Sequence, residues 1–403
     1  MAVTFTQSPE PFTPSDNPVV WVFSSDEFAQ PNFSFYVEVY VNGVLYSPHL
    51  IFPEFNGDTA HFDAEENKIS NVICSKPVPD TSAFSFSAAN NAEIYIKVYE
   101  QYGDPATLHG SETSTTVTVF KAALKDVDFN IYDSFDYEWR WPLSPRAVPL
   151  FMTFSPRLEQ VYCALNENYW LMFLSDENDL DVKISLYDSA GALIVEDTLT
   201  TVAAANKLIL INMSPALIIT TSAVIDSADF ASCAYYTATM VDGDIHHLSE
   251  SFKIYYNQDC DLYETKRLHF LSTLGGIDAY SFTKANDTGR DITRYSYEKQ
   301  LGGFDNTGAW VNDLYQGRGG DYLTTSRGRL RINSDYITQG IQNWLVDELC
   351  ESPLILIETN SGSNLSRAKI LTTNTLVKKN SQGNLIQEFI ELDTLDNRKS
   401  SLI

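Results

Sequence analysis

Hydrophobic and polar residues alternate along most of this chain, and the alternation predicts a protein built mainly from β-strands. Residues 33–46 are rich in β-branched and aromatic side chains and contain Asn42-Gly43, a strong signal for a two-residue hairpin turn. Residues 92–99 resume the same alternation. We therefore predict that residues 1–125 form a β-sandwich of about seven strands.

A second set of strand patterns follows a connector that is dense in aromatic residues and proline. The connector covers residues 126–149, and its composition is typical of a linker that lies against a neighbouring surface. Short alternating runs then recur through residues 150–257, with no amphipathic helix of useful length between them. This spacing predicts a second immunoglobulin-like β-sandwich.

The remaining residues, 258–403, are predicted to form a β-rich docking domain with one packed helix. Apolar side chains recur with clean helical spacing at residues 335–350. Ser334 is a suitable N-cap for this helix, and Pro353 would end it. A glycine-rich interval, residues 302–320, precedes the helix and has few hydrophobic anchors.

Residues 268–282, with the sequence LHFLSTLGGIDAYSF, form the stretch around which we expect the chain to be organised. Apolar side chains alternate on both sides of the glycine pair, as two short strands that meet at a tight corner require. The stretch holds no catalytic group beyond His269 and Asp278, so its simplest interpretation is a packed strand-turn-strand. The residues that define the motif are Leu268, Phe270, Leu274, Gly275, Gly276, Asp278, Tyr280 and Phe282.

This stretch resembles a motif in structural proteins of tailed bacteriophages that infect Bacteroidota, including the crAss-like phages. In that motif an aromatic-Leu-x-Phe-Leu arm runs into Leu-Gly-Gly-x-Asp-x-Tyr-x-Phe, and residues 268–282 resemble this pattern. Looser similarities to the sandwich modules of those proteins lie at residues 17–21, 33–41, 151–153 and 169–171. Met152 stands where the relatives commonly have leucine.

The resemblance implies a non-enzymatic virion protein that assembles in multiple copies as a ring, collar or baseplate component of a phage tail or neck. Its partners would be copies of itself and other tail or neck proteins of the virion. Assembly would take place in the host cytoplasm.

Charge is distributed unevenly along the 403 residues, and this changes which part of the chain is expected to meet partners. The whole chain has 27 Lys+Arg and 53 Asp+Glu, a net charge of -26. Residues 1–256 contain 34 acidic and 11 basic residues, whereas the remainder contains 19 and 16. So acidic a protein does not attract nucleic acid through its overall field, and we expect no sequence-specific nucleic-acid binding. The nearly neutral C-terminal part is the better candidate for an interface, because interface cores are depleted of charge.

One basic cluster interrupts this pattern, and its arginines alternate with aromatic and aliphatic residues such as Tyr322 and Leu330. A nucleic-acid site is one interpretation of such a cluster. Arginines beside many carboxylates favour a protein interface held by salt bridges, and we adopt that interpretation. The cluster consists of Arg318, Arg327, Arg329 and Arg331.

Motifs for catalysis and metal binding are absent from the sequence. HExxH, GxSxG, GxxxxGK[ST] and a GxGxxG after a strand do not occur, so we predict no catalytic residue, cofactor or metal and no enzymatic activity. His246-His247 would point to opposite faces of a strand, which favours a polar hairpin over a metal site. The acidic turn between Asp176 and Asp181 offers oxygen ligands for calcium but lacks the glycine and distant glutamate of an EF-hand, which favours a solvated loop.

Cysteine usage and hydropathy give no sign of a disulfide framework or of a membrane segment. The cysteines are odd in number and lack CxxC spacing, so we predict reduced thiols. Cys163 and Cys233 could imitate the bridge of an immunoglobulin domain, but Ala231 stands where the tyrosine of that motif would lie. No signal peptide and no run of eighteen apolar residues is present, so we expect no membrane insertion. The five cysteines are Cys74, Cys163, Cys233, Cys260 and Cys350.

Two functions from different classes therefore compete. The first is the virion structural protein described above, and the resemblance favours it. The alternative is a carbohydrate-binding or adhesin protein whose β-sandwiches present loops and surface aromatic residues to a glycan. A lytic enzyme ranks third.

Overall fold

The structure is a computed structural model, and it separates the chain into two compact units. The first unit comprises Met1–Gln258, Phe270–Tyr280 and Ser361–Ser363, and the second comprises Asp259–His269, Ser281–Asn360 and Asn364–Ile403. The structure describes residues 3–54, 57–73, 79–87, 91–129, 151–156, 160–174, 180–201, 208–242, 247–258, 263–312, 318–359, 364–371 and 386–401. The predicted aromatic connector lies mostly outside these residues.

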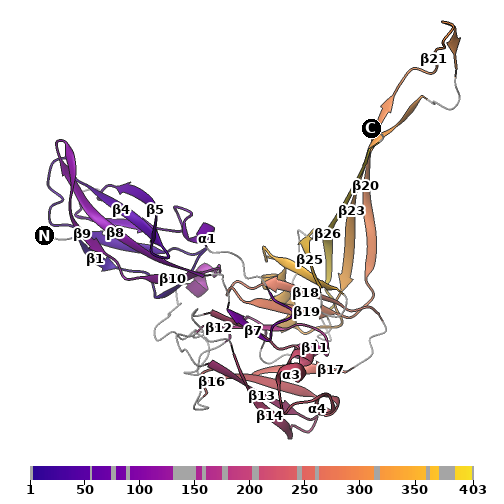
Figure 1. The fold of residues 1–403 in the computed structure, drawn as a ribbon, viewed down its shortest axis with the longest axis horizontal. Helices are drawn as coiled ribbons and strands as arrows, with labels where there is room; N and C mark the ends of the chain where they lie inside the picture. Colours follow the sequence, from indigo (N-terminus) through magenta and orange to yellow (C-terminus); the bar gives the residue numbers. More distant parts are fainter. Residues whose placement is uncertain are drawn as a thin grey trace. The chain divides into compact units, whose positions relative to one another are not determined.

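The first β-sandwich packs two sheets around an apolar core (Figure 1). One sheet has the order β1-β3-β6, and the other has the order β2-β10-β8-β4-β5 with β9 paired to β8. Buried and less buried residues alternate along β3, β4 and β8, because successive side chains of a strand face opposite sides. The elements are β1 (Thr4–Gln7), β2 (Phe12–Pro14), β3 (Val20–Ser24), β4 (Ser34–Val41), β5 (Val44–Ile51), β6 (Thr59–Asp63), α1 (Ser70–Ile73), β8 (Asn91–Gly103), β9 (Ala106–Thr113), β10 (Val117–Phe120) and α2 (Asp126–Phe129).

The hairpin expected at Asn42-Gly43 joins β4 to β5. Asn42 and Gly43 have φ angles of 48° and 78°. Two consecutive positive φ angles give a tight turn whose twist matches that of the flanking strands. The local sequence therefore determined this connection.

The second β-sandwich is built from sheets with the orders β11-β17-β16-β13-β14 and β12-β15-β7. Its core is apolar and includes side chains from both sheets, such as Leu171, Ile184 and Ile211. Two short helices accompany it, although the sequence predicted strands alone here. The elements are β7 (Ser85–Ser87), β11 (Tyr162–Ala164), β12 (Trp170–Leu174), β13 (Leu180–Tyr187), β14 (Leu193–Thr200), β15 (Leu208–Asn212), α3 (Pro215–Thr221), α4 (Ser227–Ser232), β16 (Tyr235–Asp242) and β17 (Phe252–Asn257).

One strand of the second sandwich comes from a distant part of the sequence. β7 lies within the range that the sequence assigned to the first sandwich, but it pairs antiparallel to β15, with Phe86 opposite Leu210. The neighbouring Phe84 packs into the second core. The sequence gives no sign of this pairing, because a run of three or four residues has too little pattern to indicate its partner.

The C-terminal region forms a sheet with the order β19-β18-β24-β25-β26-β23-β20 and carries a packed helix. The predicted fold class is therefore confirmed: the protein is mainly β, with two immunoglobulin-like sandwiches followed by a β-rich domain with a helix. The elements are β18 (Lys266–Leu271), β19 (Ile277–Phe282), β20 (Asp287–Glu298), β21 (Gly303–Phe304), β22 (Trp310–Val311), β23 (Gly319–Asn333), α5 (Gln339–Trp344), the π-helical turn η2 (Leu345–Leu349), β24 (Ile355–Thr359), β25 (Asn364–Ile370) and β26 (Phe389–Ser401).

The helix begins later than its apolar spacing predicted. Thr338, rather than Ser334, provides the N-cap, because its Oγ1 accepts a hydrogen bond from the backbone N–H of Ile341 at 3.3 Å. Ile337 pairs with Ile386 in an isolated bridge. Because of this tertiary pairing, the first residues of the expected helix are extended.

Candidate functional site

The glycine pair of the motif lies in the short loop between β18 and β19, where the chain reverses direction. Gly275 has a φ of 87°, a conformation that L side chains rarely adopt. Its N–H donates a hydrogen bond to the carbonyl oxygen of Ser272 at 2.8 Å, and the N–H of Ser272 donates to the carbonyl oxygen of Gly276 at 2.9 Å. Backbone hydrogen bonds therefore close the corner.

Both glycines also lie against other backbone segments of the first unit. A Cβ atom on Gly275 would collide with the carbonyl oxygen of Lys121, and one on Gly276 would collide with that of Met152. Only glycine leaves room for this approach, and Gly275 needs its conformational freedom as well. The other motif residues are buried or, for Tyr280, half-buried: Leu268, Phe270, Leu274, Asp278, Tyr280 and Phe282.

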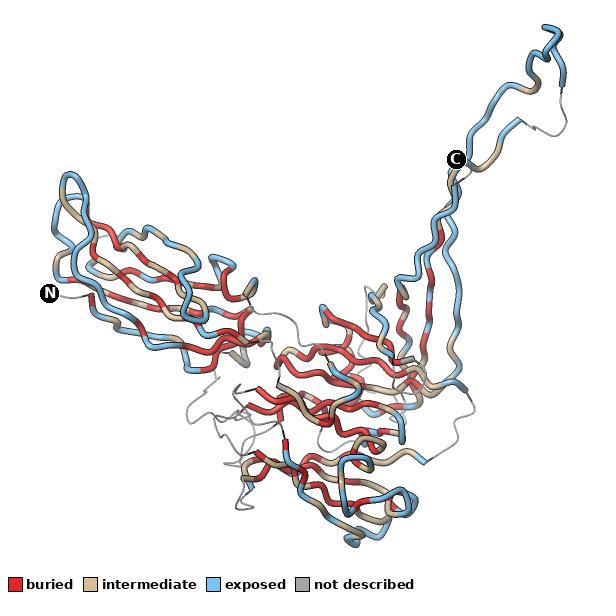
Figure 2. Tube along the Cα trace, in the orientation of Figure 1, coloured by how far each residue is buried: buried red, intermediate tan, exposed pale blue. Residues whose placement is uncertain are grey.

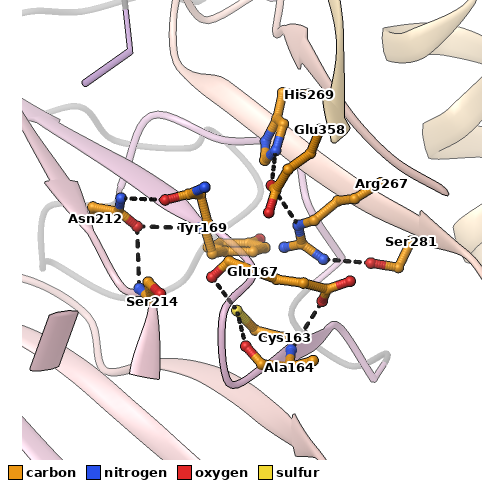
Figure 3. Close-up of polar contacts among 11 residues, drawn as sticks. Cys163, Ala164, Glu167, Tyr169, Asn212, Ser214, Arg267, His269, Ser281 and Glu358 are labelled. Atoms are coloured by element: carbon orange, nitrogen blue, oxygen red, sulfur yellow. Dashed lines mark hydrogen bonds and ion pairs between the residues drawn. The ribbon is translucent and has the colours of Figure 1, made fainter. Parts of the chain in front are cut away.

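A cluster of charged side chains lies inside the second unit, where β18 and β24 run together (Figure 3). The Nε2 atom of His269 is 2.5 Å from the Oε2 atom of Glu358, and the Nε atom of Arg267 is 3.9 Å from the same oxygen. Arg267 also donates a hydrogen bond from Nη1 to the Oγ atom of Ser281 at 2.6 Å. Of these residues, only His269 was identified from the sequence. Arg267 and Glu358 could have been identified because each is a charged residue within an otherwise apolar strand pattern.

The arrangement of this cluster is structural and does not suit catalysis. The side chains of Arg267, His269 and Glu358 are at most 4% exposed, so a substrate has no route to them. Burying such charges requires mutual pairing, because an unpaired ion loses its hydration without compensation. A second buried network lies in the first unit, where the Nδ2 atom of Asn212 donates a hydrogen bond to the Oδ1 atom of Asn168 at 2.7 Å.

The feature of the second unit best suited to an interaction is an extended group of strands, the arm, made of β20, β23 and β26 (Figures 1 and 2). β20 pairs with β23 from Asp287 to Glu298, and β26 pairs with the other side of β23 as far as Ser401. Every residue of β20 is exposed, as its pale blue trace in Figure 2 shows. A strand with both faces open to solvent has surface available for a partner.

The arm ends in a small hairpin, the tip, which we define as residues 302–312. β21 and β22 pair there, and the rings of Phe304 and Trp310 meet edge to face with centroids 5.2 Å apart. Phe304 is 76% exposed and Trp310 is 45% exposed. Part of the glycine-rich interval is therefore ordered into a hairpin that presents aromatic side chains to solvent.

The predicted arginine cluster lies on the arm. Arg327, Arg329 and Arg331 are exposed and alternate along β23, so their side chains share one face, and Arg318 is exposed just before this strand. The Nε atom of Arg329 is 2.7 Å from Asp291, and the guanidinium of Arg331 lies over a phenylalanine ring of β26. No ion pair involves Arg318 or Arg327 among the described residues. These two arginines are the members of the cluster available to a partner.

Rows of tyrosines cross both sandwiches, and we did not predict them from the sequence. In the first sandwich Tyr40 stacks on Tyr95 with centroids 4.8 Å apart. In the second, the ammonium group of Lys253 lies 3.5 Å from the ring centroid of Tyr235. The sequence feature that could have predicted these rows is the recurrence of tyrosine at alternate strand positions. The second row crosses β13, β16, β17 and β11: Tyr187, Tyr235, Tyr255 and Tyr162.

The candidate metal sites of the sequence fall mainly outside the described residues. Asp181 is on β13, whereas residues 175–179 and His246 are not described. His247 forms an isolated bridge with Val241. Across the described ranges, no three His, Cys, Asp or Glu side chains are grouped in a way that could hold a metal ion.

Three of the cysteines are described, and all three are free thiols. Cys163 and Cys233 are buried and Cys350 is partly buried. Burial raises the pKa of the Cys233 and Cys350 thiols to about 11. These two thiols stay protonated at neutral pH and are poor nucleophiles, since the thiolate is the reactive form.

No helix in the described ranges has the length and apolar character needed to cross a lipid bilayer.

Comparisons with known proteins leave the family of the chain open. No protein-family model matches the chain. No curated protein matches it either. A crystal structure of Dpr2 Ig1-Ig2 in complex with DIP-Theta Ig1-Ig3 is similar over 83% of this chain and 94% of that chain, with 6% sequence identity and a TM-score of 0.20. At that TM-score the similarity carries no argument about function.

Proposed function

We propose that this chain is a non-enzymatic structural protein of a phage virion, assembled in multiple copies as a ring or collar component of the tail or neck. The observation that carries the proposal is the arm, a group of exposed strands that ends in aromatic side chains. An isolated protein gains nothing from exposing such side chains, whereas an assembly protein buries them against a neighbour. The resemblance of the Leu-Gly-Gly-x-Asp motif to phage structural proteins supports the same function.

Charge and packing support this proposal in two further ways. Closely packed β-sandwiches are rigid, which suits a component that must hold a fixed position in a symmetric assembly. The net charge of -26 would repel DNA phosphates, so a genome would pass such a component without adhering to it. Its partners would be copies of itself and other tail or neck proteins, and it would bind no specific nucleic-acid sequence.

Electron microscopy of the purified full chain, together with mass spectrometry of purified virions, tests the proposal. We expect class averages of closed rings containing several copies, and we expect peptides of this chain in intact particles. A protein that stays monomeric at every concentration and is missing from particles would contradict the proposal.

A carbohydrate-binding function is the second candidate, and the tyrosine rows are the observation that favours it. Aromatic side chains on a sheet surface are a common platform for sugars, because ring faces pack on the apolar faces of pyranoses. The stacking of Tyr40 on Tyr95 occupies a face of each ring, which leaves less surface for a sugar. A glycan array distinguishes the candidates: strong binding that is lost in Tyr235→Ala would favour this function.

A further inference from the structure

Each unit exposes an apolar surface among its described residues. The first is the tip, where Phe304, Trp310 and Val311 are exposed. The second is β5, which ends the strand order of its sheet and displays Leu50, 53% exposed, and Phe52 just beyond its end, 67% exposed. Exposed apolar groups gathered in this way mark places where another surface binds.

The tip is already held in one conformation. The Asp305 carboxylate accepts hydrogen bonds from the backbone N–H groups of Thr307 at 2.8 Å and Ala309 at 2.9 Å. Gly302 has a φ of 87°, and a Cβ there would lie 2.5 Å from the Oδ1 atom of Asn312. Because the loop is ordered before it meets a partner, docking loses little conformational entropy. Exposed aromatic anchors on an ordered support are typical of binding hot spots.

Charge indicates that the occupant of β5 is the arm of another copy. Residues 287–333 and 389–401, which include the arm, contain nine basic and nine acidic residues, whereas residues 1–256 contain 34 acidic and 11 basic residues. Two copies that met through their acidic units would repel each other. The neutral arm can approach an acidic unit without that repulsion.

Local charges agree with this assignment. Arg318 lines an open hollow beside Trp310 at the base of the tip, where the charges of Lys299 and Glu298 offset each other. Asp58 is exposed where the chain passes from β5 to β6, and Glu54, also exposed there, lies 3.1 Å from the Nδ1 atom of His61. A tip that bound β5 would therefore bring the Arg318 guanidinium near the Asp58 carboxylate, an arrangement that improves specificity and the rate of association.

We propose that the tip docks on the exposed side chains of β5 in a second copy of this chain. The contact uses side chains and adds no strand to the sheet, because Pro48 in the middle of β5 has no N–H to donate to a new neighbour. The two surfaces differ, so the contact is head to tail, and repeated contacts of this kind close into a ring when the rotation allows it. This inference rests on the proposed function and names the interface that would build the ring.

Photo-crosslinking of the full chain tests the contact directly. Phe304→p-benzoylphenylalanine places a crosslinker at the tip, and mixing this protein with an equal amount of ¹⁵N-labelled wild type distinguishes contacts between copies from contacts within one. We expect light-to-heavy crosslinks from position 304 to peptides covering residues 44–52. Val224→p-benzoylphenylalanine, at an exposed apolar position outside both surfaces, should give no crosslinks to those peptides.

A double-mutant cycle gives an independent readout. Phe304→Ser and Phe52→Ser should each raise the dissociation constant of self-association about tenfold, and the two together should add little more, because either change removes the same contact. Phe28→Ser, at another exposed phenylalanine, is the matched control and should leave the constant unchanged. Thermal melting should be similar for all three variants, since each side chain is exposed.

The outcomes separate this inference from the proposed function. Rings that form in the Phe304→Ser variant with unchanged affinity, or crosslinks from the tip to peptides elsewhere, would overturn the docking site and leave the virion assignment intact. Crosslinks from the tip to a different virion protein would do the same. A chain that does not self-associate and is missing from particles would overturn both.

Discussion

At the scale of single residues, the corner at Gly275 and Gly276 requires residues that have no Cβ atom. Gly275 combines a positive φ with contact to the Lys121 carbonyl, and Gly276 lies against the Met152 carbonyl. Neither restriction is a matter of side-chain chemistry. Both follow from the space that a Cβ would occupy and from the backbone angles that it would forbid.

We predict that Gly275→Val and Gly276→Val strongly destabilise the first unit. The valine at 275 adds about 1 to 3 kcal/mol of backbone strain, and either valine displaces a backbone segment. Calorimetry of the full chain is the measurement, because the contacting carbonyls lie far from the corner in sequence. Gly289→Val is the matched control, since that glycine lies on β20 with nothing near its Cβ position. Equal shifts in melting temperature at all three positions would contradict the prediction.

A second residue-scale prediction concerns Tyr40. Its hydroxyl donates a hydrogen bond to the Oε2 atom of Glu38 at 2.8 Å, and this bond, followed by burial and the Glu38 charge, raises the pKa of Tyr40 to about 12. The folded chain therefore keeps this proton between pH 10 and about 12, where the unfolded chain loses it. The contribution to stability is complete below pH 10 and decreases as the pH rises toward 12.

NMR titration of ¹³C-labelled tyrosine measures this pKa, with Tyr40→Phe identifying the resonance. In Glu38→Gln the pKa of Tyr40 should fall, because the amide carries no charge to oppose ionisation. A Tyr40 that titrates near 10 with Glu38 intact would show that the hydrogen bond is absent in solution.

At the scale of elements, the helix and the tip each depend on one local device. Thr338 caps α5, although the apolar stripe begins earlier in the sequence. We predict that Thr338→Ala lowers the free energy of unfolding of the second unit by about 1 kcal/mol, because the Ile341 N–H loses its acceptor. The loss of unfolding free energy is measured by urea denaturation, which is followed by hydrogen exchange in residues 339–349. Thr338→Ser retains the hydroxyl and should restore stability, and a serine variant as unstable as the alanine variant would contradict the capping role.

The tip allows a test with neighbouring glycines. Gly302→Ala should disorder the tip, because the added methyl group meets Asn312 and the φ of 87° becomes strained. Gly303→Ala should have little effect, since nothing lies within 4 Å of its Cβ position. Hydrogen exchange of the Thr307 and Ala309 amides, which bind the Asp305 carboxylate, reports the difference. Similar exchange in both variants would show that the tip does not depend on Gly302.

At the scale of the whole molecule, the arginine face of the arm connects charge to assembly. We predict that Arg327→Glu weakens self-association, and that the loss is larger at low salt because screening reduces an exposed charge interaction. Sedimentation at two salt concentrations is the measurement. Arg398→Glu is the control, because Arg398 pairs with Ser326 and so lies on the opposite face of the arm. Tight, salt-dependent binding of duplex DNA that is lost in Arg327→Glu would favour a nucleic-acid site instead.

The sequence by itself determined the class of fold and several local features. Alternation of apolar and polar residues predicts strands because successive side chains of a strand point to opposite faces. This two-residue period can be recognised within each segment alone. The positive φ angles at Asn42, Gly43 and Gly275 are equally local. Such features need no knowledge of the rest of the chain.

Only the tertiary structure decided which segments meet and which surfaces remain open. The pairing of β7 with β15, the late start of α5, and the burial of Arg267 and His269 with Glu358 all join residues far apart in sequence. The exposure of Phe304 and Phe52 likewise depends on what the other strands cover. Hydrophobic residues usually predict burial, so the sequence alone could not mark these side chains as surfaces, because burial is a property of the assembled fold.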